Sequence, residues 1–207
     1  MKYDLTKHKD KKNLILNATY KCIYEQGVAE VSMRSIAKEA QLNQSTLHYY
    51  FKTKENLLFE FIRTLFDRFI YDLTKGYNAS EPPEKKLDAL CEAGKNHIEK
   101  EKEMWVVFAD VWSLAIRNPA MQKIFSDRYN HLSELIESII GEGMQKGVFN
   151  LVKKDIFAVS FLAFIEGLGL QWHMRKKSFD LKECFNIFIK NLKMIIVKKK
   201  RQKSTLG

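Results

Sequence analysis

Residues 32–51 read SMRSIAKEAQLNQSTLHYYF, and this stretch decides the fold of the N-terminal part of the chain. Ser32 and Asn43 are residue types that cap helix N-termini, so the pattern predicts two short helices, over 33–40 and 44–51, with a three-residue turn between them. The apolar positions that would hold the two helices at a fixed crossing are Ile36, Ala37, Ala40, Leu42 and Leu47. Two short helices joined in this way are typical of a helix-turn-helix.

The second of these helices has an outward face that suits DNA. Its outward residues, with the residue that follows the helix, are Gln44, Ser45, Thr46, His48, Tyr49 and Lys52. All of them can form hydrogen bonds and none is acidic, as expected of a helix lying in a negatively charged groove. An ordinary helical hairpin accounts for the pattern equally well.

A resemblance favours the helix-turn-helix. The segments ILNATYKCIYEQG (15–27), SMRSIAKEA (32–40) and STLHYYFKTKENLL (45–58) resemble the DNA-binding domain of the TetR family of transcription regulators. The aromatic–aromatic–Phe ending of that family's recognition helix is present at 49–51. The family usually has glycine in the turn, where this chain has Gln41; a non-glycine residue in a left-handed turn costs roughly 1 kcal/mol.

The resemblance implies roles for individual residues. Thr46, Tyr49 and Lys54 would bind phosphates, with Ser32 and Arg34 assisting from the preceding helix. The residues expected at base edges are Gln44, Ser45 and His48, with Lys52 also on the DNA-facing side. Tyr50 either joins them or packs under the helix. The N-terminal lysines that would add non-specific attraction are Lys2, Lys7, Lys9, Lys11 and Lys12.

The rest of the chain is also predicted to be helical, which makes the fold class all-α with about nine helices. Beside the two short helices, the expected ones are 7–26, one starting at Lys54 and ending near 76–83, 83–101, 104–117, 119–147, 153–175 and 180–198. The expected organisation is a DNA-binding domain at 1–53, a connecting helix at 54–78, a ligand-binding and dimerisation domain at 79–200, and a basic tail at 201–207. No strand alternation and no internal repeat is present in the sequence.

The C-terminal part resembles a branch of the same family. The segment 104–117 is apolar on almost every side, which predicts a helix buried all round. The runs WVVFADVWSLAIRNPAM (105–121) and EGLGLQW (166–172) resemble the C-terminal domain of the BetI-type branch. That resemblance implies a regulator of the kind that responds to choline-related compounds.

Aromatic and acidic residues in this part suggest a ligand site. The candidates are His97, Trp105, Phe108, Asp110, Trp112, Phe125, Tyr129, Phe164 and Glu166. A carboxylate beside aromatic faces would suit a cationic or amine ligand. Plain core packing accounts for any single aromatic residue, and the two carboxylates can instead be satisfied by Arg117, Arg128 or a backbone group.

The segment 156–174 has the length and hydropathy of a membrane span. A charge such as Glu166 in its middle is costly in lipid, so we interpret it as a dimer helix. With the last helix it would form a four-helix interface with a second copy, and the two-fold axis would match a palindromic operator. The expected interface residues are Phe161, Gly167, Gly169, Trp172, Phe185, Phe188 and Leu192.

Composition excludes several other classes of protein. The net charge of +10 favours polyanionic partners. Three scattered cysteines form no disulfide framework or zinc spacing, and the charged first residues lack a signal peptide, so a reducing cytoplasm is expected. The five histidines have no metal-ligand spacing, and no phosphate loop or catalytic motif occurs, so we expect no enzyme, metal or cofactor.

The sequence therefore predicts a repressor that binds double-stranded operator DNA as a homodimer and is released by a small apolar or cationic molecule. Two alternatives stay open. One is a DNA-binding regulator, activating or ligand-independent, whose C-terminal domain has no accessible cavity. The other is a membrane-surface protein, which the basic residues 198–203 would suit as well as they suit auxiliary DNA contact or a solvated end.

Overall fold

The structure, a computed structural model, describes residues 10–76, 78–175 and 178–197, and within these ranges it is built of helices. The helices are α1 (Lys11–Gln26), α2 (Met33–Glu39), α3 (Gln44–Tyr50), α4 (Lys54–Thr74), α5 (Pro83–Lys100), α6 (Lys102–Ala115), α7 (Pro119–Gln145), α8 (Lys154–Met174) and α9 (Leu181–Ile196). The all-α prediction is confirmed, and the predicted helix boundaries agree to within a few residues.

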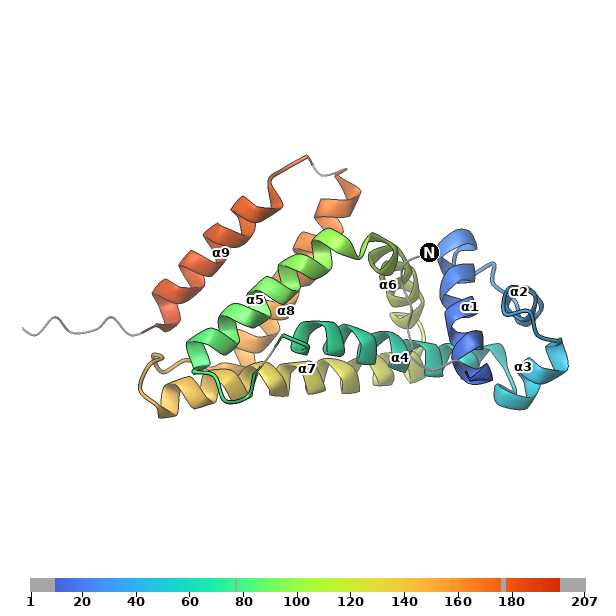
Figure 1. Cartoon of the computed structure of the whole chain (residues 1–207), viewed down its shortest axis with the longest axis horizontal. Coiled ribbons are helices and arrows are strands. Elements are labelled where there is room, and N and C mark those ends of the chain that lie inside the picture. The colour runs from blue at the N-terminus through green and yellow to red at the C-terminus, as the bar shows by residue number, and fades with distance from the viewer. Residues whose placement is uncertain (1–9, 77, 176–177, 198–207) are drawn as a thin grey trace, which may run out of the picture.

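Helices α1, α2 and α3 form a head at one end of an elongated molecule (Figure 1). The long helix α4 runs from the head into the body, where it packs against α5 and α7. Helix α6 lies where the body meets the head and contacts α1. Helices α8 and α9 lie at the far side of the body, so the DNA-binding candidates and the dimer candidates occupy different parts of the molecule.

Local capping explains where the head helices begin. The side chains of Ser32, Asn43 and Thr53 each accept a hydrogen bond from a backbone N–H in the first turn of α2, α3 and α4. Ser35 completes a reciprocal capping box with Ser32, because its hydroxyl accepts from the Ser32 N–H at 2.9 Å. The caps predicted at Ser32 and Asn43 are confirmed, and Asn118 caps α7 in the same way.

The turn between α2 and α3 has the predicted left-handed conformation. Gln41 has φ +55° and is the single non-glycine residue with positive φ in the described chain. Its side chain is exposed, so the left-handed backbone conformation does not remove a side chain from the core. The helix-turn-helix therefore forms without the usual glycine.

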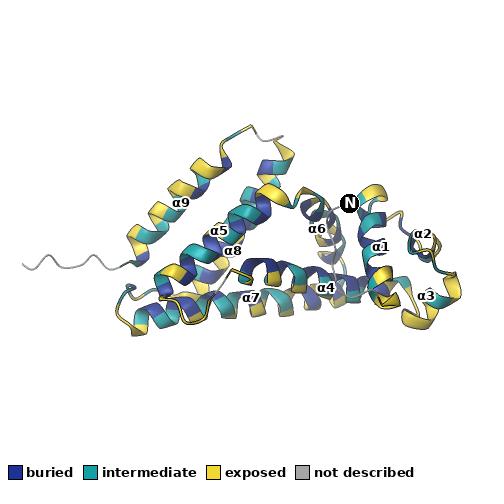
Figure 2. Ribbon diagram, viewed as in Figure 1, coloured by how far each residue is buried: buried dark blue, intermediate teal, exposed yellow. Residues whose placement is uncertain are grey.

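A continuous apolar core joins head and body. In the head it is made by Ile15, Ile23, Ile36 and Leu47, all nearly inaccessible to solvent. Helix α4 continues it with one buried stripe, as Figure 2 shows: Leu57, Leu58, Phe61, Ile62, Leu65, Phe66 and Phe69. Helix α4 thus belongs to one packed core that the head and the body share.

The prediction that 104–117 is buried all round was wrong. Val106, Trp112 and Ile116 are 41%, 43% and 54% exposed. Helix α6 packs against α1, α7 and α8 on one side, while the other side faces solvent. High mean hydropathy identified the helix but not which side of it is covered.

Helix α8 is long and apolar enough to cross a membrane by length and composition, and it is the one helix of the described chain that passes this test. In the fold it packs against α5, α6 and α7. We therefore interpret its hydropathy as the result of burial on one side and an apolar outer face on the other.

Close packing of α7 on the following loop leads to a stability prediction. A Cβ atom added at Gly143 would lie 2.0 Å from Cδ2 of Phe149, whose side chain is fully buried. We expect Gly143→Ala to lower the free energy of unfolding by about 2–3 kcal/mol, because the ring must move out of a packed site. Urea denaturation measures this.

Gly141→Ala is the matched control, since its added Cβ would meet nothing within 4 Å on the same helix. It should leave the protein as stable or raise its stability by about 0.5–1 kcal/mol. Equal stability changes in both variants would contradict the packing described for Phe149.

Candidate functional site

Helix α3 presents its polar face at the tip of the head. Gln44, Ser45, His48 and Tyr49 are exposed, Tyr49 by 82%, whereas Leu47 is fully buried beneath them (Figure 2). The side chains of Gln44 and His48 are neighbours, with 3.4 Å between Nε2 of each. One helix face thus carries hydrogen-bonding groups over two turns, as reading of base edges in a major groove requires.

Asn43 organises the start of this helix. Its Oδ1 accepts hydrogen bonds from the Thr46 N–H at 2.8 Å, from the Thr46 hydroxyl at 2.5 Å and from the Ser45 hydroxyl at 2.9 Å. Both hydroxyls must rotate away from Asn43 before they can donate to DNA. This local network was not foreseen, although Asn before Gln-Ser-Thr is a sequence signal for it.

The Lys54 side chain, which was predicted to bind phosphate, has its hydrogen-bond partners within the head. Its Nζ donates to the carbonyl oxygens of Val28 at 3.1 Å and Ala29 at 3.4 Å, at the loop between α1 and α2. The ammonium group therefore fixes the head internally. The N-terminus of α4 keeps backbone N–H groups that favour an anion.

Other predicted DNA contacts are placed at the same end. Arg34 and Lys52 are exposed, and Ser32 is used in the cap of α2. Tyr50 is 40% exposed and packs edge-on against Tyr49, with 5.3 Å between ring centroids. The two tyrosines brace each other, so Tyr50 supports the more exposed ring.

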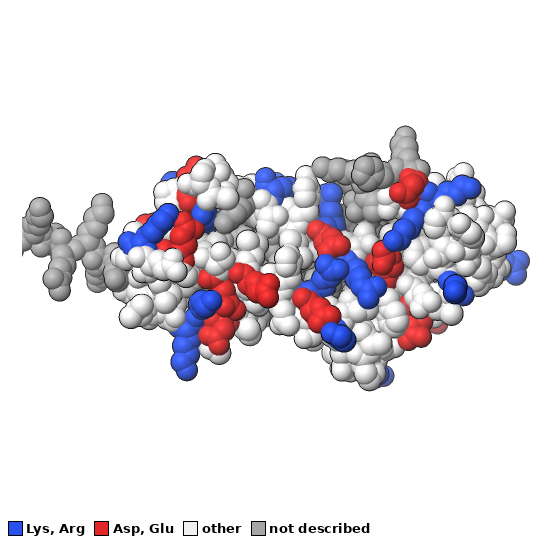
Figure 3. Space-filling view, turned by 90° about the horizontal axis from the view of Figure 1, so that it is seen from below, with Lys and Arg blue, Asp and Glu red and all other residues white. Residues whose placement is uncertain are grey.

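The positive charge of the chain is concentrated outside the described residues. Those residues contain 25 Lys and Arg and 24 Asp and Glu, so most of the net charge of +10 belongs to 1–9, 176–177 and 198–207. On the face shown in Figure 3, acidic and basic side chains lie beside one another over the body. Ion pairs of the body include Arg128 with Asp67 at 2.6 Å.

Asp110, which was predicted to line a ligand site, forms a hydrogen bond to the head. Its Oδ2 accepts a hydrogen bond from the Val28 N–H at 2.5 Å. A carboxylate on α6 thereby holds the α1–α2 loop, to which Lys54 also donates. Of the partners expected for this carboxylate, a backbone group is the one observed. The hydrogen bond connects the body to the head.

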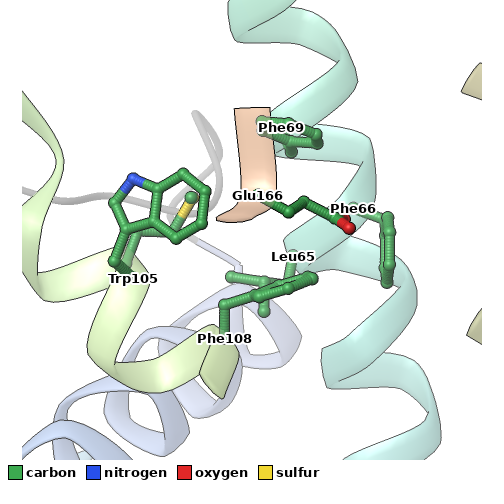
Figure 4. Close-up of a pocket in the computed structure, with 7 residues that line it drawn as sticks. Leu65, Phe66, Phe69, Trp105, Phe108 and Glu166 are labelled. Carbon is green, nitrogen blue, oxygen red and sulfur yellow. The ribbon is translucent and has the colours of Figure 1, made fainter. Parts of the chain in front are cut away.

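The aromatic centre of the body leaves little free space, and Figure 4 shows the side chains around it. A void of about 10 Å³ lies between α4, α6 and α8 and is lined by Leu65, Phe66, Phe69, Met104, Trp105, Phe108 and Glu166. This volume holds about one water molecule. Trp105, Phe108 and Glu166 were predicted; the α4 residues were missed, although their stripe was visible in the sequence.

Glu166 is the charged residue of this void and bonds to a neighbour. The Tyr129 hydroxyl donates to its Oε1 at 2.6 Å. Burial raises the pKa of Glu166, and burial with the adjacent carboxylate raises that of Tyr129. Phe164, also predicted here, instead stacks on Phe188 of α9 with ring centroids 3.5 Å apart.

His97 is buried between Phe69 and Trp105, with ring centroids 4.7 Å and 5.8 Å away. It is 3% exposed, and neither ring nitrogen has a hydrogen-bond partner among the described residues. Burial lowers the pKa of His97 to about 3, so the ring is neutral at physiological pH. It also forms the floor of a cleft of about 400 Å³ between α4 and α5.

This burial makes stability depend on pH. The pKa of His97 is lower in the folded than in the unfolded chain, so the unfolded chain binds more protons between pH 3 and 6.5 and stability falls as pH falls through this window. When the pH falls from 7 to 5, the free energy of unfolding of the parent chain should decrease. In His97→Phe we expect this decrease to be smaller by about 2 kcal/mol. Urea denaturation at both pH values measures this, with the exposed His131→Gln as a control that should lose as much as the parent.

The predicted interface residues differ in how far they are exposed in the single chain. Phe161, Trp172 and Phe185 are 9% exposed or less and pack inside the protomer, and a Cβ at Gly169 would lie 2.5 Å from Trp105. Gly167 faces open space, and Phe188 and Leu192 are half-buried. The exposed apolar residues of α8 and α9 are Ile156, Val159, Met174, Ile187, Met194 and Ile195.

Comparison with known proteins agrees with this geometry. Residues 15–61 match the family described as bacterial regulatory proteins, tetR family, and residues 83–195 match the BetI-type transcriptional repressor C-terminal family. The HTH-type transcriptional regulator PksA of Bacillus subtilis is 30% identical over 169 residues, which cover 79% of this chain and 78% of PksA.

The chain belongs to the TetR family of transcriptional regulators.

Solved structures share the fold of this TetR-family regulator. A TetR regulator from Haloarcula marismortui has a TM-score of 0.81 and 23% identity over 91% of this chain and 100% of its own. A transcriptional regulator from Saccharomonospora viridis in complex with choline has a TM-score of 0.79 and 23% identity over 93% of this chain and 100% of its own. The matched relatives are regulators of transcription and not enzymes, as the sequence predicted.

Proposed function

We propose that this protein is a dimeric repressor in the bacterial cytoplasm that binds a palindromic operator and is released by a small apolar or cationic molecule. The observation that carries the DNA-binding part is the exposed polar face of α3, held at the tip of the head by the Asn43 cap and the buried Leu47. In this proposal Gln44, Ser45 and His48 read base edges, and Tyr49, Thr46 and Arg34 bind phosphates.

Dimerisation is proposed through the exposed apolar face of α8 and α9. Ile156, Val159 and Met174 lie on one side of α8 with the small residues Ala163 and Gly167, at helical spacing. In a dimer joined there, a two-fold axis would relate the two heads, and both would lie at the same end of the dimer. A palindrome with half-sites about 34 Å apart, or a multiple of this, would follow. The division into a head at 1–53, a connecting helix at 54–78 and an effector and dimer domain at 79–200 is part of this proposal.

Effector control is supported by the contacts between body and head. Helix α6 contributes Trp105 and Phe108 to the aromatic void and Asp110 to the α1–α2 loop. A ligand that enlarges the void must displace α4 or α6, and both helices are fixed to the head. The choline complex of the Saccharomonospora neighbour supports a cationic effector for this chain.

A regulator without small-molecule control is a second candidate, favoured by the void of only about 10 Å³. Titration of the operator complex with choline and with laurate, followed by fluorescence anisotropy, separates the two functions. The repressor proposal expects an organic cation to lower operator affinity, and the operator to lower cation affinity by the same factor. Binding of laurate alone would refute the cationic effector, and unchanged affinities with and without operator would refute release by ligand.

A further inference from the structure

An open groove lies on the other side of the aromatic centre. It runs between α6 and α7, has a volume of about 390 Å³ and is lined by Trp112, Ala115, Ile116, Gln122, Phe125, Ser126, Tyr129 and Asn130. None of these residues is charged. The exposed rings and aliphatic chains of Trp112 and Ile116 give the groove an apolar entrance of the size of a small organic molecule.

A single layer of side chains separates this groove from the central void. Phe125 lines the groove and packs against Phe66 and Phe108 of the void, with centroids 5.0 Å and 6.0 Å apart. Tyr129 lines the groove and packs against Phe66 at 5.4 Å. Because both rings belong to α7, rotation of these two side chains would join the two spaces.

The hydroxyl of Tyr129 closes the wall over the half-buried carboxylate of Glu166. It donates to Glu166 Oε1 at 2.6 Å. Glu166 has no Lys or Arg ion pair among the described residues. A half-buried carboxylate without a cation, behind a layer of aromatic rings, is complementary to a ligand that supplies the missing charge.

We propose that the α6–α7 groove and the central void are two halves of one effector site for a lipophilic organic cation, with Tyr129 as its gate and Glu166 as its anchor. The inference rests on the proposed effector control and names the ligand class and path. The aromatic part of the ligand lies in the groove beside Trp112. Its ammonium group replaces the Tyr129 hydroxyl at Glu166 and holds Phe125 and Tyr129 apart.

The closing experiment uses the full chain and two probes of similar size, benzyltrimethylammonium and the anion phenylacetate, in isothermal calorimetry. We expect the cation to bind at least about tenfold more tightly than the anion, and Glu166→Gln to remove about tenfold of its affinity. Tyr129→Phe should raise the affinity for the cation about tenfold, because the bond to the carboxylate no longer has to be broken. A tyrosine with a merely structural role would give the opposite sign.

Groove-filling variants test the path. Ser126→Trp and Gln122→Trp place a large ring in the groove from exposed positions of α7 and should each weaken binding of benzyltrimethylammonium at least about tenfold. Ser113→Trp, at an exposed position of α6 that does not line the groove, is the matched control and should bind as the parent does.

Each outcome bears on the inference. Failure of the cation to bind the parent chain would overturn the ligand class, and equal binding by the parent, Ser126→Trp and Gln122→Trp would overturn the groove. Neither result would refute repression itself, because operator binding is measured separately and the substituted residues lie outside the head.

Discussion

Tyr49→Ala should abolish tight operator binding while leaving the fold intact. The Tyr49 ring is 82% exposed and packs on one neighbour, Tyr50, so its removal costs little folding energy. In the proposed complex it donates to a phosphate, and a hydrogen bond to a charged group contributes about 2 kcal/mol. A dimer has two such contacts, so we expect affinity to fall at least about 100-fold, measured by anisotropy with a selected operator.

Two further variants show whether the loss of operator affinity in Tyr49→Ala comes from the Tyr49 hydroxyl. Tyr49→Phe should lose nearly as much affinity as Tyr49→Ala if the hydroxyl makes the contact. Leu151→Ala, at a position 85% exposed between α7 and α8, should bind DNA as the parent does. Unchanged operator affinity in Tyr49→Ala would show that the tip of α3 does not face DNA.

A charge on the outer face of α8 should produce monomers. Val159 is 61% exposed beside Ile156, which is 58% exposed, and a second copy would cover both. Val159→Asp would bury an unpaired carboxylate in that interface, which costs several kcal/mol. We expect a monomer by analytical ultracentrifugation, with operator affinity lowered more than about 100-fold because one head binds a half-site alone.

Ile116→Asp is the matched control for the interface. Ile116 is 54% exposed but lies at the C-terminal cap of α6, away from the proposed face on α8 and α9, and the same change there should leave the dimer intact. If Val159→Asp stayed dimeric and Ile116→Asp became monomeric, the interface would not be formed by α8 and α9.

Much of the head could be predicted because its structure depends on local chemistry. Ser32, Asn43 and Thr53 cap helices through bonds to residues three positions away, and such bonds follow from spacing alone. Gln41 takes the left-handed turn that its place between two caps requires. The family resemblance assigned the recognition helix, and the structure places that helix at the exposed tip.

Contacts between residues far apart in the chain could not be predicted from the sequence. Asp110 reaches Val28, 82 residues away, and Lys54 reaches the same loop, so two charged residues that were expected at ligands have backbone partners in the head. The packing partners of Phe164 and Gly169 depend on how α8 meets α9 and α6. Periodicity shows that a residue is apolar or small, but tertiary packing decides which neighbour it meets.

The central claim is that two copies of α3 read a two-fold symmetric DNA sequence. In vitro selection from a random duplex library with the full-length protein, followed by sequencing, tests it most directly. We expect the enriched duplexes to share a palindrome whose half-sites lie about one helical turn or a multiple of it apart, and Tyr49→Ala to enrich none. Enrichment of no motif, or of a motif without two-fold symmetry, would contradict the account.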